Sequence, residues 1–311
     1  MARRIAFLFA ALLIVSCGGT TLAPASPSAS ATSSARASAA AFPTSVTDFQ
    51  NRSVAIAKRP ERIVTIGPSN TEFVFALGAG DRVVGDDDFS DEPAAAKTKE
   101  HVGGVKVSLE KVAALKPDLV ITVKFSDGTI EALTQTSAAV LVVDPQGAAD
   151  VARTATLIGR AIGADGDALA ASIQKQLDAV KAKTDGAPKL KVFHEVDASD
   201  PAKIYTVGPG SFISDLITLA GGMNVFASAK TAYPTVSGEE IVRSDPDVIV
   251  LGDALYGTTV ESVAARPGWA ALSAVKAKRV YAGLSLFGRP GPRLGAAAEA
   301  YARLVHPELF K

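Results

Sequence analysis

The sequence has very little cysteine, histidine and tryptophan, and these scarcities limit what it can do. It contains one cysteine, three histidines and one tryptophan in 311 residues. One cysteine cannot form an intramolecular disulfide, so the hydrophobic core alone must stabilise the fold. A site for a bare metal ion needs three or four ligating side chains at one place. With only His101, His194 and His306 as imidazole ligands, a binder of bare metal ions is a secondary alternative.

The chain also lacks an excess of either charge, because 32 lysines and arginines face 32 aspartates and glutamates. Without a basic surface it does not suit a nucleic-acid backbone, and we expect no nucleic-acid partner. Catalytic signatures are missing too. There is no Gly-x-Ser-x-Gly elbow, and the two short Gly-x-Gly segments at 78–80 and 208–210 lack the third glycine of a dinucleotide fingerprint. We therefore expect neither an enzyme nor a cofactor.

The N-terminus carries an export signal. Arg3 and Arg4 precede an apolar run at residues 5–15, which is too short to cross a bilayer as a helix but suits a signal peptide over residues 1–16. Cys17 follows a small residue and precedes two glycines. This pattern resembles a bacterial lipobox, whose cysteine is lipidated, whereas the alternative is a buried free cysteine. Removal of residues 1–16 leaves 30 basic and 32 acidic residues, a net charge of −2.

Residues 17–45 are dominated by Ser, Ala, Thr and Pro, a composition too polar to form a core, which predicts a disordered tether. After it, short apolar runs alternate with helical patterns, which predicts an α/β fold. We expect an N-terminal lobe at 46–147, a bridging helical segment at 148–186 and a C-terminal lobe at 187–311. Within the first lobe, Ser69 and Glu72 fit a capping box that opens a helix. The acidic run at 86–92 lacks the glycine of a calcium loop, so we expect it to be solvated.

The two predicted lobes share an internal repeat. Four pairs are each 129 residues apart: Ser108 and Ser237, Glu110 and Glu239, Pro117 and Pro246, Asp118 and Asp247. A second match precedes the first in both copies, in which Thr65, Gly67 and Pro68 correspond to Thr206, Gly208 and Pro209. Both copies therefore read as strand, Gly-Pro turn, helix, Ser-x-Glu helix, Pro-Asp and strand. Two similar lobes with a cleft between them are the expected result.

Several segments carry a family resemblance: GPSNTE (67–72), LKPDLV (115–120), GPGSFI (208–213), AGGMNV (220–225), RPGW (266–269) and RPGPR (289–293). Together they resemble the periplasmic binding proteins of the cobalamin and ferric-siderophore import class. The resemblance implies two Rossmann-like lobes joined by a long bridging helix, with the ligand cleft between them. It also implies that Glu110 and Glu239 contact arginines of an importer's permease. Read from the sequence alone, each glutamate is also an acid in the first turn of a helix, which the helix dipole favours.

The same resemblance places ligand-binding residues on loops at the carboxyl ends of the strands. Phe89 and Tyr233 match aromatic residues of cobalamin binders, and Arg289 matches an arginine near the ligand. Each has an alternative structural role: Phe89 and Tyr233 could pack on their own lobe, and Arg289 could hold a C-terminal helix. Phe125, Tyr205 and Phe287 are further candidates on similar loops, and we leave open whether His101 or His194 contacts the ligand. Gly104, Val123 and Leu286 stand where cobalamin binders carry cleft tryptophans.

These inferences predict a monomeric, exported substrate-binding protein, lipid-anchored to the outer face of the cell membrane. Its partners would be a small-molecule metal chelate and the permease dimer of an ABC importer with its ATPase subunits. A corrinoid such as cobalamin is the first candidate ligand, and a ferric siderophore or haem is the second. A surface lipoprotein with a structural or adhesive role is a further alternative, but it would not need two lobes with a repeated rim.

Overall fold

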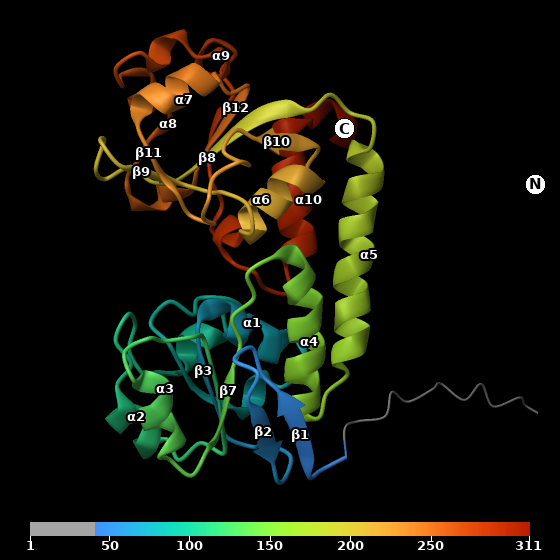
Figure 1. Cartoon of the computed structure of the whole chain (residues 1–311). Helices are drawn as coiled ribbons and strands as arrows, with labels where there is room; N and C mark the ends of the chain where they lie inside the picture. Colours follow the sequence, from blue (N-terminus) through green and yellow to red (C-terminus); the bar gives the residue numbers. More distant parts are fainter. Residues whose placement is uncertain (1–40) are drawn as a thin grey trace, which may run out of the picture. The chain divides into compact units, whose positions relative to one another are not determined.

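The structure, a computed structural model, describes residues 41–311. The predicted signal peptide, Cys17 and most of the predicted tether lie outside the described residues. Among the residues described, no helix has both the length and the apolar character needed to cross a membrane. Residues 41–311 contain two sheet-based lobes and a helical pair between them (Figure 1).

The N-terminal lobe is built on a parallel sheet of five strands. Their order is β5 (Glu100–His101), β4 (Val83–Asp86), β3 (Ile63–Ile66), β6 (Leu119–Thr122) and β7 (Ala139–Val142). The short helices α1 (Pro68–Ala76), α2 (Leu109–Ala114) and α3 (Thr129–Thr134) connect them, and the hairpin of β1 (Thr44–Thr47) and β2 (Ser53–Ile56) precedes them. β3 and β6 are buried along their whole length, as continuous apolar runs in a parallel sheet should be. Chain order reverses between β3 and β6, and open α/β sheets bind ligands at such a point.

The C-terminal lobe has a mixed sheet. Its strands run in the order β11 (Thr235–Val236), β9 (Ile204–Thr206), β8 (Leu190–Asp197), β12 (Val248–Leu251) and β13 (Val280–Ala282), and β10 (Gly222–Asn224) also pairs with β8. The helices are α6 (Phe212–Leu219), α7 (Gly238–Ser244), α8 (Val260–Ala264), α9 (Ser273–Lys276) and α10 (Leu294–Val305). β9 and β11 are antiparallel to their neighbours, so this lobe is Rossmann-like only from β8 to β13. Trp269 is buried in its core and stacks edge-on against Phe193.

Two antiparallel helices join the lobes. α4 (Ala148–Ile162) contacts the N-terminal lobe, and α5 (Gly166–Thr184) packs against α10 and α6 of the C-terminal lobe. Gly159 and Gly166 allow this close pairing, because a Cβ on Gly159 would lie 2.5 Å from the Gly166 backbone. The buried residues of α5 include Ile173, Leu177 and Val180, which recur at helical spacing. The predicted long bridging helix is therefore α5, and α4 runs beside it (Figure 1).

The internal repeat performs the same structural tasks in both lobes. Ser108 and Ser237 cap α2 and α7, each accepting a hydrogen bond from the backbone N–H three residues later. Asp118 accepts hydrogen bonds from the N–H groups of Glu61 and Arg62 at 2.9 and 3.0 Å, beside the start of β3. The second copy does the same, since Asp247 accepts one from the N–H of Lys191 in β8 at 2.7 Å. Each Pro-Asp aspartate thus ties the beginning of one strand to the beginning of its neighbour.

The predicted capping box at Ser69 and Glu72 is wrong. α1 begins at Pro68 after Gly67, whose φ of 103° suits glycine, and no side chain caps it. Proline favours this position because its missing N–H would be unpaired at a helix start in any case. The side chain of Glu72 is instead buried and bonded to arginines of the other lobe.

The acidic run at 86–92 is also not simply solvated, because Asp86 and Asp87 are buried. Asp87 accepts hydrogen bonds from the N–H groups of Gly67 and Phe89 and from the hydroxyl of Ser90, which orders the loop after β4. Asp86 Oδ1 lies 2.8 Å from His101 Nδ1, whereas its buried Oδ2 has no partner. Burial raises the pKa of Asp86 to about 6, although the hydrogen bond with His101 opposes this change.

The repeated aspartates give a first prediction. Replacing Asp118 with Ala removes two hydrogen bonds from backbone N–H groups to a charged acceptor, and should lower the free energy of unfolding by about 1–3 kcal/mol. Asp247→Ala removes one such bond in the other lobe and should cost less than Asp118→Ala. Urea denaturation of residues 41–311 measures both. Asp200→Ala is the control, because Asp200 bonds only to Ala202 within its own turn, and a loss as large in this variant would contradict the assignment.

Asp86 gives a second prediction. Because its pKa is higher in the folded protein than the unfolded value of roughly 3.9, its stabilising contribution is complete below pH 4 and is lost as the pH rises through about 6. Between pH 4 and 7, wild type should therefore lose about 2–3 kcal/mol of stability relative to Asp86→Asn. Thermal unfolding at several pH values measures the difference. Parallel profiles for the two proteins would refute it.

A control for this experiment is Asp127→Asn. Asp127 is exposed, and its hydrogen bonds from Thr129 lower its pKa. Since the sign of the shift is opposite to that at Asp86, this substitution should not reproduce the relative loss of stability with rising pH.

Candidate ligand cleft

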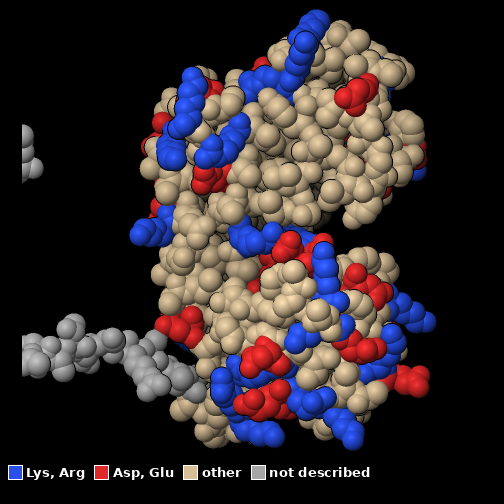
Figure 2. Space-filling model, turned by 180° about the vertical axis from the view of Figure 1, so that it is seen from behind, with Lys and Arg blue, Asp and Glu red and all other residues tan. Residues whose placement is uncertain are grey.

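A cavity of about 700 Å³ lies between the two lobes. Its lining comes from the segments after β3, β4, β12 and β13, from the second half of β8 and from the start of α6: Pro68, Ser69, Asp88, Phe89 and Asp91 from one lobe, and His194, Val196, Ile213, Gly252, Leu255, Tyr256, Leu284, Ser285, Phe287, Gly288 and Arg289 from the other. The volume is typical of small-molecule sites. Seen from behind, the molecule is notched between the lobes, and the N-terminal lobe shows a denser mixture of charges than the broad uncharged surface above it (Figure 2).

The walls of the cavity present apolar side chains to solvent. The exposed fraction is 52% for Phe89, 60% for Leu255, 89% for Tyr256 and 49% for Leu284. Exposed apolar side chains that surround one cavity are typical of an interaction site, whereas exposed apolar residues elsewhere on a protein surface are usually scattered singly. The Phe89 ring lies against Gly104, where a Cβ would be 3.1 Å from the ring. The absence of a side chain at Gly104 therefore makes room for Phe89.

A cluster of ion pairs, two of whose members line the cavity, joins the lobes. Arg293 binds Glu72 with two hydrogen bonds of 2.8 Å, from Nε to Oε2 and from a terminal nitrogen to Oε1. Arg289 contacts Glu72 Oε1 at 3.3 Å and Asp91 Oδ1 at 2.5 Å. The hydrogen bond from Arg289 lowers the pKa of Asp91. The predicted cleft arginine is thus present in the cleft, and in this structure it is paired with acids of the opposite lobe.

His194 lines the cavity and His101 does not. His194 is buried, its Nδ1 is 3.0 Å from the hydroxyl of Tyr301, and its ring stacks on that tyrosine. Burial lowers the pKa of His194 to about 3, so the imidazole stays neutral at physiological pH. A neutral imidazole offers a polar group without charge to a bound molecule. His101 is committed to Asp86 instead.

The other predicted ligand residues are dispersed. Phe287 lines the cavity but is almost fully buried, and its ring packs on Tyr301. Phe125 is partly buried against the core of its own lobe. Tyr205 is exposed on β9, where it pairs with Thr235. Tyr233 is also half-exposed, and its pKa is raised by burial and by the nearby charge of Asp144 in the opposite lobe. Tyr233 therefore faces the N-terminal lobe outside the main cavity.

Glu110 and Glu239 occupy equivalent places in the two lobes. Each is an exposed residue in the first turn of its helix, α2 or α7. Neither glutamate forms an ion pair within residues 41–311. In Figure 1 both helices lie on the side of the molecule away from α4 and α5. Two unpaired carboxylates on the same side can receive basic side chains of a partner.

Sequence reasoning missed Leu255, Tyr256 and Leu284. Leu255 and Tyr256 belong to the 3-10 helix η3 (Gly252–Tyr256), which begins where β12 ends. Leu284 follows β13. The available signal was position alone, since apolar residues directly after buried parallel strands lie at the ligand-binding edge of the sheet.

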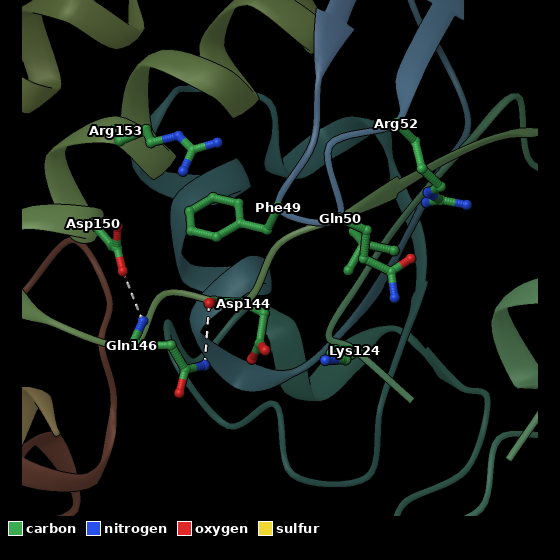
Figure 3. Close-up of a pocket in the computed structure, with 9 residues that line it drawn as sticks. Phe49, Gln50, Arg52, Lys124, Asp144, Gln146, Asp150 and Arg153 are labelled. Carbon is green, nitrogen blue, oxygen red and sulfur yellow. Dashed lines mark hydrogen bonds between the residues drawn. The ribbon is translucent and has the colours of Figure 1, made fainter. Parts of the chain in front are cut away.

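A second cavity of about 750 Å³ lies on the N-terminal lobe. Figure 3 shows Phe49 within it, between Arg153 and Asp144. Three of its five charged side chains have partners: Arg52 is bonded to Asp48, Arg153 lies 4.4 Å from the Phe49 ring centre, and Asp150 accepts from the N–H groups at 146 and 147. This cavity is lined by one lobe and α4, without the second lobe. We therefore take the cavity between the lobes as the candidate site. No group of metal-ligating side chains occurs among residues 41–311.

Comparison with known proteins agrees with this geometry. Residues 63–285 match the model of the periplasmic binding protein family. An uncharacterised ABC transporter substrate-binding lipoprotein of Bacillus subtilis is 36% identical, over 98% of this chain and 97% of its own. A cobalamin-binding protein of Halobacterium salinarum is 34% identical, over 78% and 69% of the two chains.

Solved structures show the same fold. The periplasmic vitamin B12 binding protein of Vibrio cholerae superimposes with a TM-score of 0.68 at 26% identity, covering 81% of this chain and 99% of that one. The family provides substrate-binding components of transporters and not enzymes. With two lobes, a bridging helix and a cavity between them, the chain belongs to the periplasmic binding protein family and is the substrate-binding component of an ABC transporter.

Proposed function

We propose that the protein captures a metal chelate, with cobalamin or another corrinoid as the first candidate, and delivers it to an ABC importer. The observation that carries the proposal is the cavity between the lobes, whose exposed walls come from Phe89 on one side and Leu255, Tyr256 and Leu284 on the other. Aromatic and aliphatic faces suit a planar macrocycle, and Arg289 suits polar groups on its periphery. The names of the cobalamin-binding relatives support the same ligand class.

Haem or a ferric siderophore is the alternative ligand. The neutral imidazole of His194 in the lining of the cavity supports this alternative, because imidazole is a good ligand for iron. In either case the proposed ligand residues are Phe89, Arg289 and Phe287 in the cavity, with Tyr233, Tyr205 and Phe125 at more distant positions. The protein performs no chemistry on its ligand in this proposal.

Delivery requires docking on the permease, and we assign it to Glu110 and Glu239. Their exposure, their equivalence in the repeat and the absence of ion pairs within residues 41–311 support this role. Lipidation of Cys17 would hold the exported, monomeric protein on the outer face of the membrane through a tether, close to the importer. A lipid anchor would restrict diffusion of the ligand-bound protein to the membrane surface, where the importer lies.

Ligand identity is tested by calorimetric titration of residues 41–311 with cyanocobalamin, haem and a ferric trihydroxamate in separate experiments. We expect one-to-one binding of cyanocobalamin, and replacement of Phe89 by Ala should weaken it by roughly 5- to 50-fold because an apolar contact face is lost. Val105→Ala is the control, since Val105 is exposed but lies outside the cavity. Binding of an iron chelate alone would move the specificity to the alternative, and binding of none of the three would contradict the proposal.

Docking is tested by the double variant Glu110→Lys and Glu239→Lys. Because charge reversal places like charges opposite a basic partner, uptake of the ligand by cells should fall at least tenfold. Affinity of the purified variant for the ligand should stay within about twofold of wild type, because neither residue lines the cavity. Reversal of Glu61 and Glu261, two other exposed acids, is the matched control. Unchanged uptake in the first variant, or an equal loss in the control, would contradict the assignment.

A further inference from the structure

The cluster of ion pairs beside the cavity contains two acids in very different positions. Glu72 is buried, with a side chain 4% exposed, and two hydrogen bonds from Arg293 satisfy its oxygens. Asp91 is 51% exposed and contacts Arg289 alone among the charged residues described. Removing Glu72 from its partners would leave an uncompensated buried charge, whereas Asp91 can turn into water. The cluster therefore has one fixed acid and one that can be exchanged.

Arg289 is the residue that both acids share. Its side chain is 16% exposed, and it lines the cavity together with Asp91 and Phe89, whose backbone carbonyl it also approaches at 3.4 Å. The two arginines and two acids balance in charge. An additional acidic group in the cavity would therefore disturb this balance unless one of the protein's own acids left. Asp91 is the acid with the smaller cost of leaving.

We propose that Asp91 occupies the position on Arg289 that an acidic group of the ligand takes, so that binding exchanges one for the other. The proposal rests on the proposed function and narrows it to chelates that carry a peripheral carboxylate or phosphodiester. Arg289 supplies a fork of N–H donors that matches either group. Asp91 balances the charge of this arginine while the cavity is empty. An uncharged ligand gains no binding free energy by displacing Asp91, because it has no acidic group to bind Arg289. Glu72 and Arg293 hold the two lobes together throughout the exchange.

The proposal predicts a dependence on ligand charge in Asp91→Asn. Without the competing carboxylate, cyanocobalamin, whose nucleotide loop carries a phosphodiester, and haem, which carries two carboxylates, should each bind about two- to fivefold more tightly. Dicyanocobinamide, which lacks the nucleotide loop, should bind with unchanged affinity. Glu92→Gln is the matched control, because Glu92 is an exposed neighbour that forms no ion pair with either arginine. Equal changes for all ligands, or weaker binding of the acidic ones, would overturn the proposal.

A second measurement separates this proposal from the proposed function. Inorganic phosphate is titrated into wild type and Asp91→Asn while the Nε–H signal of Arg289 is followed by nuclear magnetic resonance. We expect the signal to shift at about two- to fivefold lower phosphate in the variant. The signal is assigned to Arg289 by its disappearance in Arg289→Lys, and the remaining arginine signals serve as the reference. A phosphate response that is the same in wild type and Asp91→Asn would refute the exchange, whichever chelate the protein binds. Failure of all chelates to bind, with the phosphate response as expected, would instead refute the proposed function alone.

Discussion

The buried carboxylate of Glu72 constrains the relation between the two lobes. A charge with only 4% of its side chain exposed is costly unless it is paired and hydrogen-bonded, and its partners Arg289 and Arg293 come from the other lobe. The carboxylate of Glu72 therefore has its ion-pair partners only when the C-terminal lobe is in place. Because α1 carries Glu72 and also begins at the carboxyl end of β3, this pairing fixes the edge of the cavity as well.

The bridging helices impose a second constraint that acts together with the first. α5 packs against α6 and α10, and α4 packs against α5 and the N-terminal lobe. Covalent connection and helix packing on one side and ion pairs on the other leave limited freedom for the lobes to separate. A cavity formed in this way is largely preformed, which reduces the conformational cost of binding. The same arrangement places Phe89 of one lobe and Tyr256 of the other on one cavity.

Features that depend on local sequence could be predicted. The repeat identified the N-caps Ser108 and Ser237 and the equivalent places of Glu110 and Glu239, because a cap requires only residues within one turn. The helical segment expected at 148–186 contains α4 and α5. The internal repeat also indicated two similar lobes with a cleft between them, whereas the family resemblance supplied the long bridging helix and Arg289.

Features that depend on distant partners could not be predicted. Glu72 fitted a capping box by its spacing from Ser69, but its partner Arg293 lies 221 residues away in the sequence. The burial of Asp86 and Asp87 depends on the neighbouring strand β5 and on the N–H of Gly67. Tyr256 carries no motif, and its place in the cavity lining becomes visible only when the segment after β12 is brought near Phe89. Composition could not distinguish such residues from ordinary surface positions.

We propose that one ligand binds between the lobes and contacts both of them. Hydrogen–deuterium exchange of residues 41–311 with and without cyanocobalamin tests this claim directly. We expect exchange to slow together in three segments, residues 88–91, 252–256 and 284–289, at the same ligand concentration. Protection confined to one lobe, or to the cavity beside the β1–β2 hairpin, would contradict it.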